Sequence, residues 1–366
     1  HVCFLRSPYP HARLIDIDIS AALKMPGVYS VLTGDDISAI TDPIVSAIRA
    51  PATYYPIAVE KVRYVGEPVA LVIADDRYLG EDAAEVINVT YEELPAVVDP
   101  LEAIKATAPF LHEKVGSNVL HDRQFIYGDP DKAFAEADHV IKLNWRYPKQ
   151  SATPMETFGV IAQFERQPDR YTVWSNFQGP YILQPIMARA LRVSGNFLRL
   201  ISAPFSGGSF GLKQSIYPYI VLLAAASRIS GLPLKWTEDR LEHLMASSSA
   251  ADRADELEAA FTSDGTLLGL RFKNCVNVGA YVRAPEPASV YRMHAASNGC
   301  YAVKNISIQN KLVSTNKMPV GLNRGYGGPQ FYYGLERMMD LTARKLNIDT
   351  AEIRRKNFIP EDQFPY

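Results

Sequence analysis

Short apolar segments alternate along the first part of the chain with segments of helical pattern. Residues 68–74 form a continuous apolar run, which is typical of a buried β-strand. Asp75 and Asp76 follow directly and can cap a helix that runs to about Val86. Val89 and Tyr91 then alternate with polar residues, as in a half-buried strand. This alternation predicts α/β or α+β organisation for this part of the chain.

A polar stretch at residues 113–123 is the best candidate for a domain boundary. Beyond it, the pattern predicts helices at residues 130–137, 182–193 and 215–230, and one helical face formed by Phe331, Leu335, Met338, Leu341 and Leu346. It predicts strands at residues 140–147, 160–164, 171–175, 198–203, 255–278 and 307–313. Asp349 and Glu352 are spaced as a capping pair for a last helix. Mixed strands and helices in both parts indicate an α+β fold.

The composition is that of an ordinary globular protein, with 366 residues of which 47% are hydrophobic and 21% are charged. At about 150 residues per domain, this length predicts two domains. The formal net charge of −2 shows no basic excess, which argues against nucleic acid as a main partner. The longest apolar run, residues 220–226, is far shorter than the ~20 residues of a membrane span, so no membrane partner is expected.

The cysteines Cys3, Cys275 and Cys300 stand far apart and form no C-x-x-C pair. This spacing excludes an iron–sulfur cluster or a four-cysteine zinc site held by this chain alone. Sparse thiols are typical of a reducing cytoplasm, which is the expected location. A strand-like run starts directly after His1, and the chain ends at Tyr366 without a polar tail, so we expect a fragment or one piece of a split subunit.

Two glycine-rich loops, at residues 205–211 and 323–330, each stand between a predicted strand and a predicted helix. Glycine lets the backbone approach a ligand closely, and free amides at a helix start can bind an anion. Neither loop is a P-loop, and Gln330 stands where the third glycine of a G-x-G-x-x-G would be. A pair of tight turns is the alternative. Two loops of the same kind favour a phosphate-bearing ligand.

The first loop also contains Gly207-x-Ser209-x-Gly211, which is the G-x-S-x-G pattern of a serine esterase. In that hypothesis Ser209 is the nucleophile, and His243 or His294 is its base. No His-Gly-Gly segment for an oxyanion hole lies upstream, which weakens the hypothesis.

Four further motifs occur in one order along the chain. They are R-S-P-Y-P-H-A at residues 6–12, Y-V-G-E-P-V-A at 64–70, G-D-P-D-K-A-F at 128–134 and R-G-Y-G-G-P-Q at 324–330. With the first glycine loop among them, the chain resembles the molybdopterin-binding large subunit of the molybdenum hydroxylase family, which includes xanthine dehydrogenase and aldehyde oxidase. The resemblance implies an α/β hammerhead domain at residues 1–124 and a first, mixed α/β molybdopterin-binding domain at residues 125–366.

The resemblance also implies that the cofactor carries the chemistry: a molybdenum–hydroxide attacks the substrate carbon, and water supplies the oxygen. The implied cofactor is molybdopterin with molybdenum, alone or as its cytosine dinucleotide. Iron–sulfur clusters and FAD are then expected in partner chains, because this chain has no cysteine set and no flavin motif for them. A second molybdopterin domain or subunit is a further expected partner, because the G-x-G-E context of the family's glutamate base is absent here. The substrate is expected to be a small aldehyde or N-heterocycle.

The same resemblance assigns roles to single residues. Gln178 matches a glutamine that contacts the metal's apical oxo group, Arg324 an arginine beside cofactor and substrate, and Arg292 a substrate-pocket arginine that stabilises negative charge. These three are the expected catalytic residues, and no protein side chain is expected to ligate the metal. Without the resemblance, Gln178 is a surface amide and Arg292 an ion-paired surface residue. The remaining expected residues are Gly207, Gly208, Phe210, Gly211 and Gly325 for the cofactor, and Gln214 and Tyr326 for the substrate pocket.

The chain departs from the family pattern at three places. Ser209 replaces a glycine of the family's G-G-G-F-G. Gln214 occupies the place of a glutamate with which purine-oxidising members bind the ring, which argues against xanthine as the substrate. Residues 320–326 lack the copper-binding cysteine of the carbon monoxide dehydrogenases. This absence argues against a true carbon monoxide dehydrogenase. A third hypothesis, beside the hydroxylase and the esterase, is a non-catalytic homologue kept as an assembly subunit.

Overall fold

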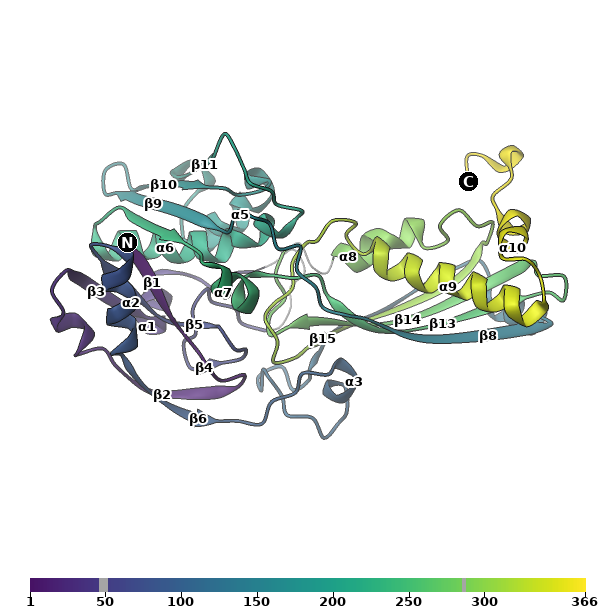
Figure 1. Ribbon diagram of the computed structural model, residues 1–366, viewed down its shortest axis with the longest axis horizontal. Coiled ribbons are helices and arrows are strands. Elements are labelled where there is room, and N and C mark those ends of the chain that lie inside the picture. The colour runs from purple at the N-terminus through teal and green to yellow at the C-terminus, as the bar shows by residue number, and fades with distance from the viewer. Residues whose placement is uncertain (46–51, 285–287) are drawn as a thin grey trace.

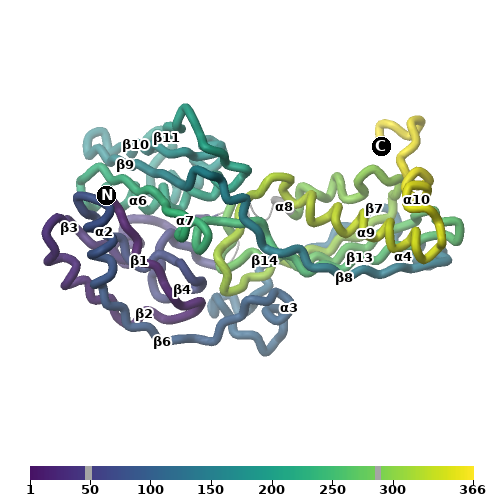
Figure 2. The backbone as a smooth tube through the Cα atoms, viewed as in Figure 1, coloured from purple at the N-terminus to yellow at the C-terminus, as the bar shows by residue number. Residues whose placement is uncertain are grey.

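A computed structural model describes residues 1–45, 52–284 and 288–366. The molecule is elongated, and a lobe of short strands and helices at one end is joined to a long sheet at the other (Figure 1). The backbone trace places the N-terminus in the first lobe and the C-terminus at the far end of the second (Figure 2).

Two small sheets open the first lobe. In one, β5 (Pro68–Ala74) lies between β1 (Val2–Arg6) and β3 (Val28–Thr33) and is antiparallel to both. Every residue of β5 is buried, which explains its uninterrupted apolar run. The Asp76 side chain caps α2 (Arg77–Glu85), which packs on this sheet. The other sheet places β2 (Ala12–Asp18) between β4 (Lys61–Val62) and β6 (Asn88–Glu93), and the short helices nearby are α1 (Gly34–Ile40) and α3 (Pro100–Ala103).

A four-stranded sheet completes this lobe, in the order β11 (Leu198–Ser202), β10 (Arg170–Ser175), β9 (Gly159–Glu165) and β12 (Leu234–Thr237). Helices α5 (Pro180–Ala190) and α6 (Tyr217–Ser230) belong to this part, and α7 (Arg240–Glu242) follows β12. Residues 217–227 of α6 are all buried, because α6 lies between this sheet and the N-terminal strands in one apolar core. A helix that is apolar all round is typical of such a position.

The second lobe is a five-stranded sheet in the order β7 (Val119–Tyr127), β15 (Asn305–Ser314), β14 (Leu267–Gly279), β13 (Asp252–Phe261) and β8 (His139–Tyr147). The connection between the parallel strands β14 and β15 contains α8 (Ala288–Tyr291). The long helix α9 (Gly328–Leu346) packs on one face of the sheet through Phe331, Leu335 and Met338 (Figure 1). The remaining helices are α4 (Pro130–Ala135) and α10 (Thr350–Asn357).

The structure confirms the α+β organisation and most of the expected elements, including strand 68–74 with the same bounds. The candidate boundary at residues 113–123 includes the start of β7, which begins at Val119 and pairs with β15. Polar residues are compatible with this strand because it lies at the sheet edge with several positions exposed. The domain division at residue 124 stays a prediction, and β7 runs across it.

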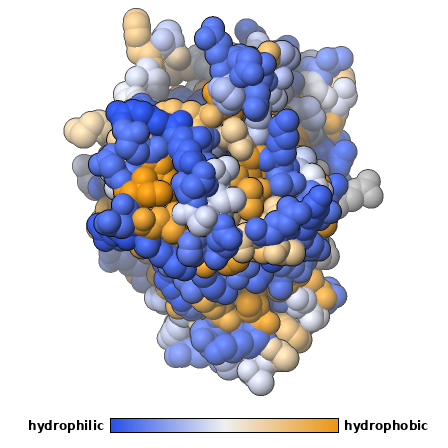
Figure 3. All heavy atoms as spheres, turned by 90° about the vertical axis from the view of Figure 1, so that its right-hand side faces the viewer, coloured by the Kyte–Doolittle hydropathy of each residue, from blue (hydrophilic) through white to orange (hydrophobic). Residues whose placement is uncertain are grey.

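Within the described ranges, no helix combines the length and apolar character that crossing a bilayer requires. Seen from the end that carries the C-terminus, hydrophilic side chains cover most of the surface and separate several hydrophobic patches (Figure 3).

Candidate cofactor-binding site

The two glycine loops meet in space, although they are far apart in the sequence. The backbone amide of Arg324 donates a hydrogen bond to the carbonyl oxygen of Phe210 at 2.8 Å. The Arg324 guanidinium carbon lies 4.9 Å from the centre of the Phe210 ring. At Gly211, an added Cβ would lie 2.0 Å from Cδ2 of Leu322, so only glycine allows this approach. The first loop leads from β11 into α6, and the second leads from β15 into α9.

Both loops contain residues with left-handed backbone. In the first loop φ is +95° at Gly208, +53° at Phe210 and +104° at Gly211, and in the second it is +38° at Tyr326 between Gly325 and Gly327, which are also positive. Non-glycine residues in this region are strained, and such strain gathers at ligand and active sites. The loops are therefore held in one shape at the cost of local strain.

Gln178 lies directly beside the first loop. It follows β10, and its side-chain Oε1 accepts a hydrogen bond from the Ser209 hydroxyl. Its backbone amide also donates to the carbonyl oxygen of Lys213 at 3.4 Å. Gln178, Phe210 and Arg324 are all exposed. The structure thus brings three of the predicted residues to one open face.

A buried ion pair that the sequence analysis missed supports the first loop. The Lys213 side chain has no exposed surface, and its ammonium donates to Oε2 of Glu156. The same oxygen accepts the backbone amide of Gly207 at 2.9 Å. Burial of Glu156 opposes ionisation, but the hydrogen bonds from Lys213 and Gly207 hold the pKa of this carboxyl below its usual value. The position of Lys213 next to the apolar segment that forms α6 could have indicated this pair, because a lysine that is buried with such a segment needs a partner of opposite charge.

Arg292 and Tyr326 form a second pair. The Arg292 guanidinium carbon lies 5.8 Å from the centre of the Tyr326 ring, so Arg292 joins the site through the second loop. Gln214 is buried, and its backbone amide donates to the carbonyl oxygen of Gly211 at 3.2 Å.

A small cavity of about 20 Å³ adjoins the second loop, and its lining includes Arg324, Tyr326 and Gln330. Oε1 of Gln330 is buried and has no hydrogen-bond partner within the part of the chain that the structure describes. A buried acceptor without a donor is costly, so this atom fits a ligand that presents an N–H group. Gln330 lies in the first turn of α9, where the helix dipole favours negative charge. The sequence analysis considered Gln330 only as an interruption of a glycine pattern.

The geometry contradicts the esterase hypothesis. The Ser209 hydroxyl donates to Gln178, and the non-glycine residue of the loop with positive φ is Phe210 instead of Ser209. His243 is fully buried with its Nδ1 2.7 Å from Glu238 Oε2, and His294 Nε2 lies 2.9 Å from Asn310 Nδ2. Neither of these two histidines therefore gives Ser209 the hydrogen bond that activates a serine nucleophile.

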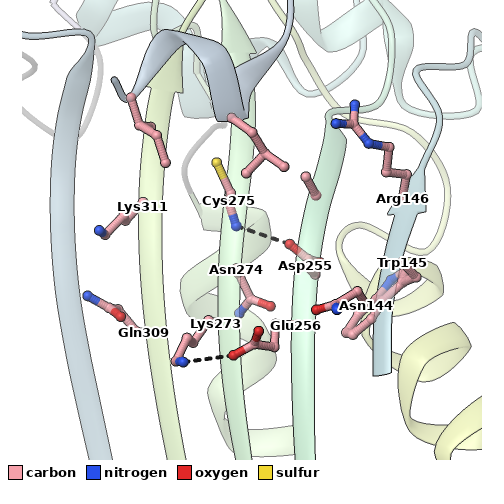
Figure 4. A pocket seen from close by; sticks show the side chains of 13 residues that line it. Asn144, Trp145, Arg146, Asp255, Glu256, Lys273, Asn274, Cys275, Gln309 and Lys311 are labelled. Atoms are coloured by element: carbon pink, nitrogen blue, oxygen red, sulfur yellow. Dashed lines mark hydrogen bonds and ion pairs between the residues drawn. The ribbon is translucent and has the colours of Figure 1, made fainter. Parts of the chain in front are cut away.

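A larger cavity, about 650 Å³, lies on the five-stranded sheet next to α3 (Figure 4). None of the predicted site residues lines it. Its Lys273 and Glu256 side chains are paired with one another at 2.7 Å, and Asp255 accepts the backbone amide of Cys275 at 3.1 Å. These three groups have partners within the protein, whereas Asn274 Oδ1 and Trp145 Nε1 of the same lining are buried without a hydrogen-bond partner among the described residues.

Two family descriptions match the chain: "Molybdopterin cofactor-binding domain" over residues 111–358, and "Aldehyde oxidase and xanthine dehydrogenase, a/b hammerhead domain" over residues 1–95. The chain belongs to the molybdenum hydroxylase family. The resemblance drawn from the motifs is thereby confirmed.

Several members of this family are similar along the whole chain. The carbon monoxide dehydrogenase large chain of Hydrogenophaga pseudoflava is 36% identical, with 100% of this chain and 47% of the relative covered. The nicotine 6-hydroxylase large subunit of Paenarthrobacter nicotinovorans is 35% identical, with 100% and 45% covered. The structure of quinoline 2-oxidoreductase from Pseudomonas putida 86 superposes with a TM-score of 0.93 at 32% identity, with 100% and 47% covered. The chain spans about half the length of the curated relatives that it matches.

Proposed function

We propose that this chain forms one wall of a molybdopterin site in a hydroxylase that oxidises an N-heterocycle or an aldehyde, with water as the oxygen source. The observation that carries the proposal is the junction of the two glycine loops, where the Arg324 amide bonds the Phe210 carbonyl beside Gln178. The names of two similar proteins, a nicotine 6-hydroxylase and a quinoline 2-oxidoreductase, favour the N-heterocycle.

The residues present fit this cofactor. When bound, molybdopterin with its molybdenum supplies the two-electron oxidation of the substrate carbon. The amide of Gln178 donates a hydrogen bond to the cofactor without adding charge. The backbone of the first loop, from Gly207 and Gly208 to Phe210 and Gly211, lies against it. Arg324 and Gly325 hold it from the second loop, and the orphaned Gln330 Oε1 accepts an N–H group of the pterin.

Substrate contacts come from other side chains. Tyr326 packs on an aromatic ring of the substrate, and Arg292, whose guanidinium carbon lies 5.8 Å from the centre of the Tyr326 ring, stabilises negative charge that develops during the reaction. Gln214 stands in place of a purine-binding glutamate and is buried, which supports a substrate other than xanthine.

The rest of the assembly is proposed from the open face of the site. Met155, Tyr181 and Phe205 lie within three residues of Glu156, Gln178 and Ser206 in the sequence, and Phe205 is 87% exposed. Exposed aromatic and apolar groups of this kind mark an interaction surface. A second molybdopterin domain or subunit covers it and brings the general base.

Iron–sulfur and FAD chains accept the electrons, and the complex is cytoplasmic. The cofactor is molybdopterin or its cytosine dinucleotide, and the hammerhead and first molybdopterin domains divide at residue 124.

Elemental analysis of the intact complex tests the proposal. We expect about one molybdenum per copy of this chain, and oxidation of quinoline or benzaldehyde with an artificial electron acceptor. An active complex without molybdenum or tungsten would overturn the proposal. A complex without molybdenum and without activity would instead support the assembly homologue. Inactivation of the complex by a fluorophosphonate would instead support the esterase hypothesis.

A further inference from the structure

Ser209 is a residue that the proposed function leaves without a role, and its surroundings give it one. Its hydroxyl donates to Oε1 of Gln178, and its oxygen accepts the backbone amide of Lys213 at 3.3 Å. Among the residues that the structure describes, this is the one hydrogen bond of the Gln178 side-chain amide, which is otherwise exposed.

The direction of the serine proton follows from its other partner. A backbone N–H can only donate, so the Lys213 amide occupies a lone pair of the Ser209 oxygen. The Ser209 proton is then free to point at a second acceptor, and the carbonyl end of the Gln178 amide is the acceptor within reach. The chain of donors therefore runs from the Lys213 amide to Ser209 and from Ser209 to Gln178 Oε1.

This order decides which end of the amide faces outward. The oxygen and the NH2 group of a glutamine are nearly equal in shape, so an unpinned side chain populates both orientations. Because Oε1 is held by Ser209, the NH2 group is directed away from the loop and keeps both of its N–H bonds available.

We propose that Ser209 is a positioning residue that fixes the Gln178 amide with its NH2 group toward the cofactor. This inference rests on the proposed function, because Gln178 is there the amide that meets the cofactor. The Lys213 backbone contributes to the same orientation by directing the serine proton, and the buried pair of Lys213 and Glu156 holds that segment in place.

The test uses the intact complex and four substitutions. Ser209→Ala and Ser209→Gly both remove the hydroxyl, and because Ser209 does not need positive φ, neither alters the backbone requirement. Gln178→Ala removes the oriented amide, alone and combined with Ser209→Ala. Ser202→Ala, at the exposed end of β11, is the matched control. Three quantities are measured: molybdenum content, the Mo(V) electron paramagnetic resonance spectrum after dithionite reduction, and kcat and KM for quinoline.

We expect Ser209→Ala and Ser209→Gly to retain molybdenum but to show a mixture of Mo(V) spectra where the parent shows one. We expect kcat to fall about three- to tenfold, the effect of losing one neutral hydrogen bond, with little change in KM. In the Gln178→Ala background, Ser209→Ala should change neither spectrum nor rate further. Ser202→Ala should match the parent.

Two results would overturn the inference without touching the proposed function. One is a parent-like Mo(V) spectrum and kcat in both Ser209 variants of a molybdenum-containing complex. The other is a full effect of Ser209→Ala in the Gln178→Ala background, since the serine would then act independently of that amide. A parent complex that lacks molybdenum refutes the proposed function itself, and with it the inference.

Discussion

Replacing Glu156 by Gln tests whether the buried ion pair supports the first glycine loop. Glutamine has nearly the same volume and keeps an oxygen to accept the Gly207 amide, so the change removes mainly the charge. The Lys213 ammonium, which has no exposed surface, then loses its counter-charge. Breaking such a pair costs about 3–5 kcal/mol, and because the Glu156 side chain is 39% exposed, water screens part of it. We therefore expect the lower end, about 3 kcal/mol.

Thermal unfolding of the complex measures this effect. At about 2 °C per kcal/mol for a large domain, Glu156→Gln should lower the Tm by about 6 °C. The control is Lys213→Met, which removes the buried charge and leaves a carboxylate that water can reach, so its loss should be smaller. The double variant should be no less stable than Lys213→Met alone.

The pH dependence gives an independent check of the same pair. The pKa of Glu156 is lower in the folded than in the unfolded state, so the stabilisation is complete above the unfolded value, about 4.3. It is lost as the pH falls through the folded pKa, and the difference between parent and Glu156→Gln should shrink there. A Tm of Glu156→Gln equal to that of the parent, or additive losses in the double variant, would refute the reasoning.

Three other substitutions have expected outcomes. Gly211→Ala places a Cβ 2.0 Å from Leu322 Cδ2 at a φ of +104°, which distorts the first glycine loop, so the complex should lose molybdenum. The control is Gly159→Ala, where no atom lies within 4 Å of the added Cβ, and this variant should retain molybdenum. Gln330→Leu removes a buried acceptor that has no partner in the described chain, so the free energy of unfolding of the cofactor-free protein, measured by calorimetry, should rise by about 1–3 kcal/mol. The molybdenum content of the complex should fall, and an unchanged content would contradict the contact assigned to Gln330. Burial raises the pKa of Asp255 to about 7, so the folded state binds an extra proton and loses stability as the pH rises from about 4 to 7. Asp255→Asn should remove that loss, so its stability relative to the parent should rise from about pH 4 to pH 7 and stay constant above, and parallel stability curves would contradict this.

The local elements and the family could be predicted from the sequence because their signals are local. The apolar run of β5, the Asp76 cap of α2 and the apolar face of α9 depend on residues within a few positions of one another. The motifs that identify the family are equally short and contiguous. Strand β7 was not predicted, because an edge strand with many polar residues has the same local sequence pattern as a polar linker. Only its pairing with β15, which is distant in the sequence, identifies it as a strand.

The site itself depends on contacts between distant parts of the chain, which no local pattern encodes. The packing of the two lobes brings Phe210 of the first loop to Arg324 of the second, and folding within the first lobe brings Glu156 to the ammonium of Lys213. The parallel pairing of β10 with β11 places Gln178 near Ser209, which is thereby a donor to Gln178 instead of a candidate nucleophile. The sequence determined which residues could act, whereas the tertiary structure decided their partners, because a hydrogen bond or ion pair forms only where folding brings both groups within about 3 Å.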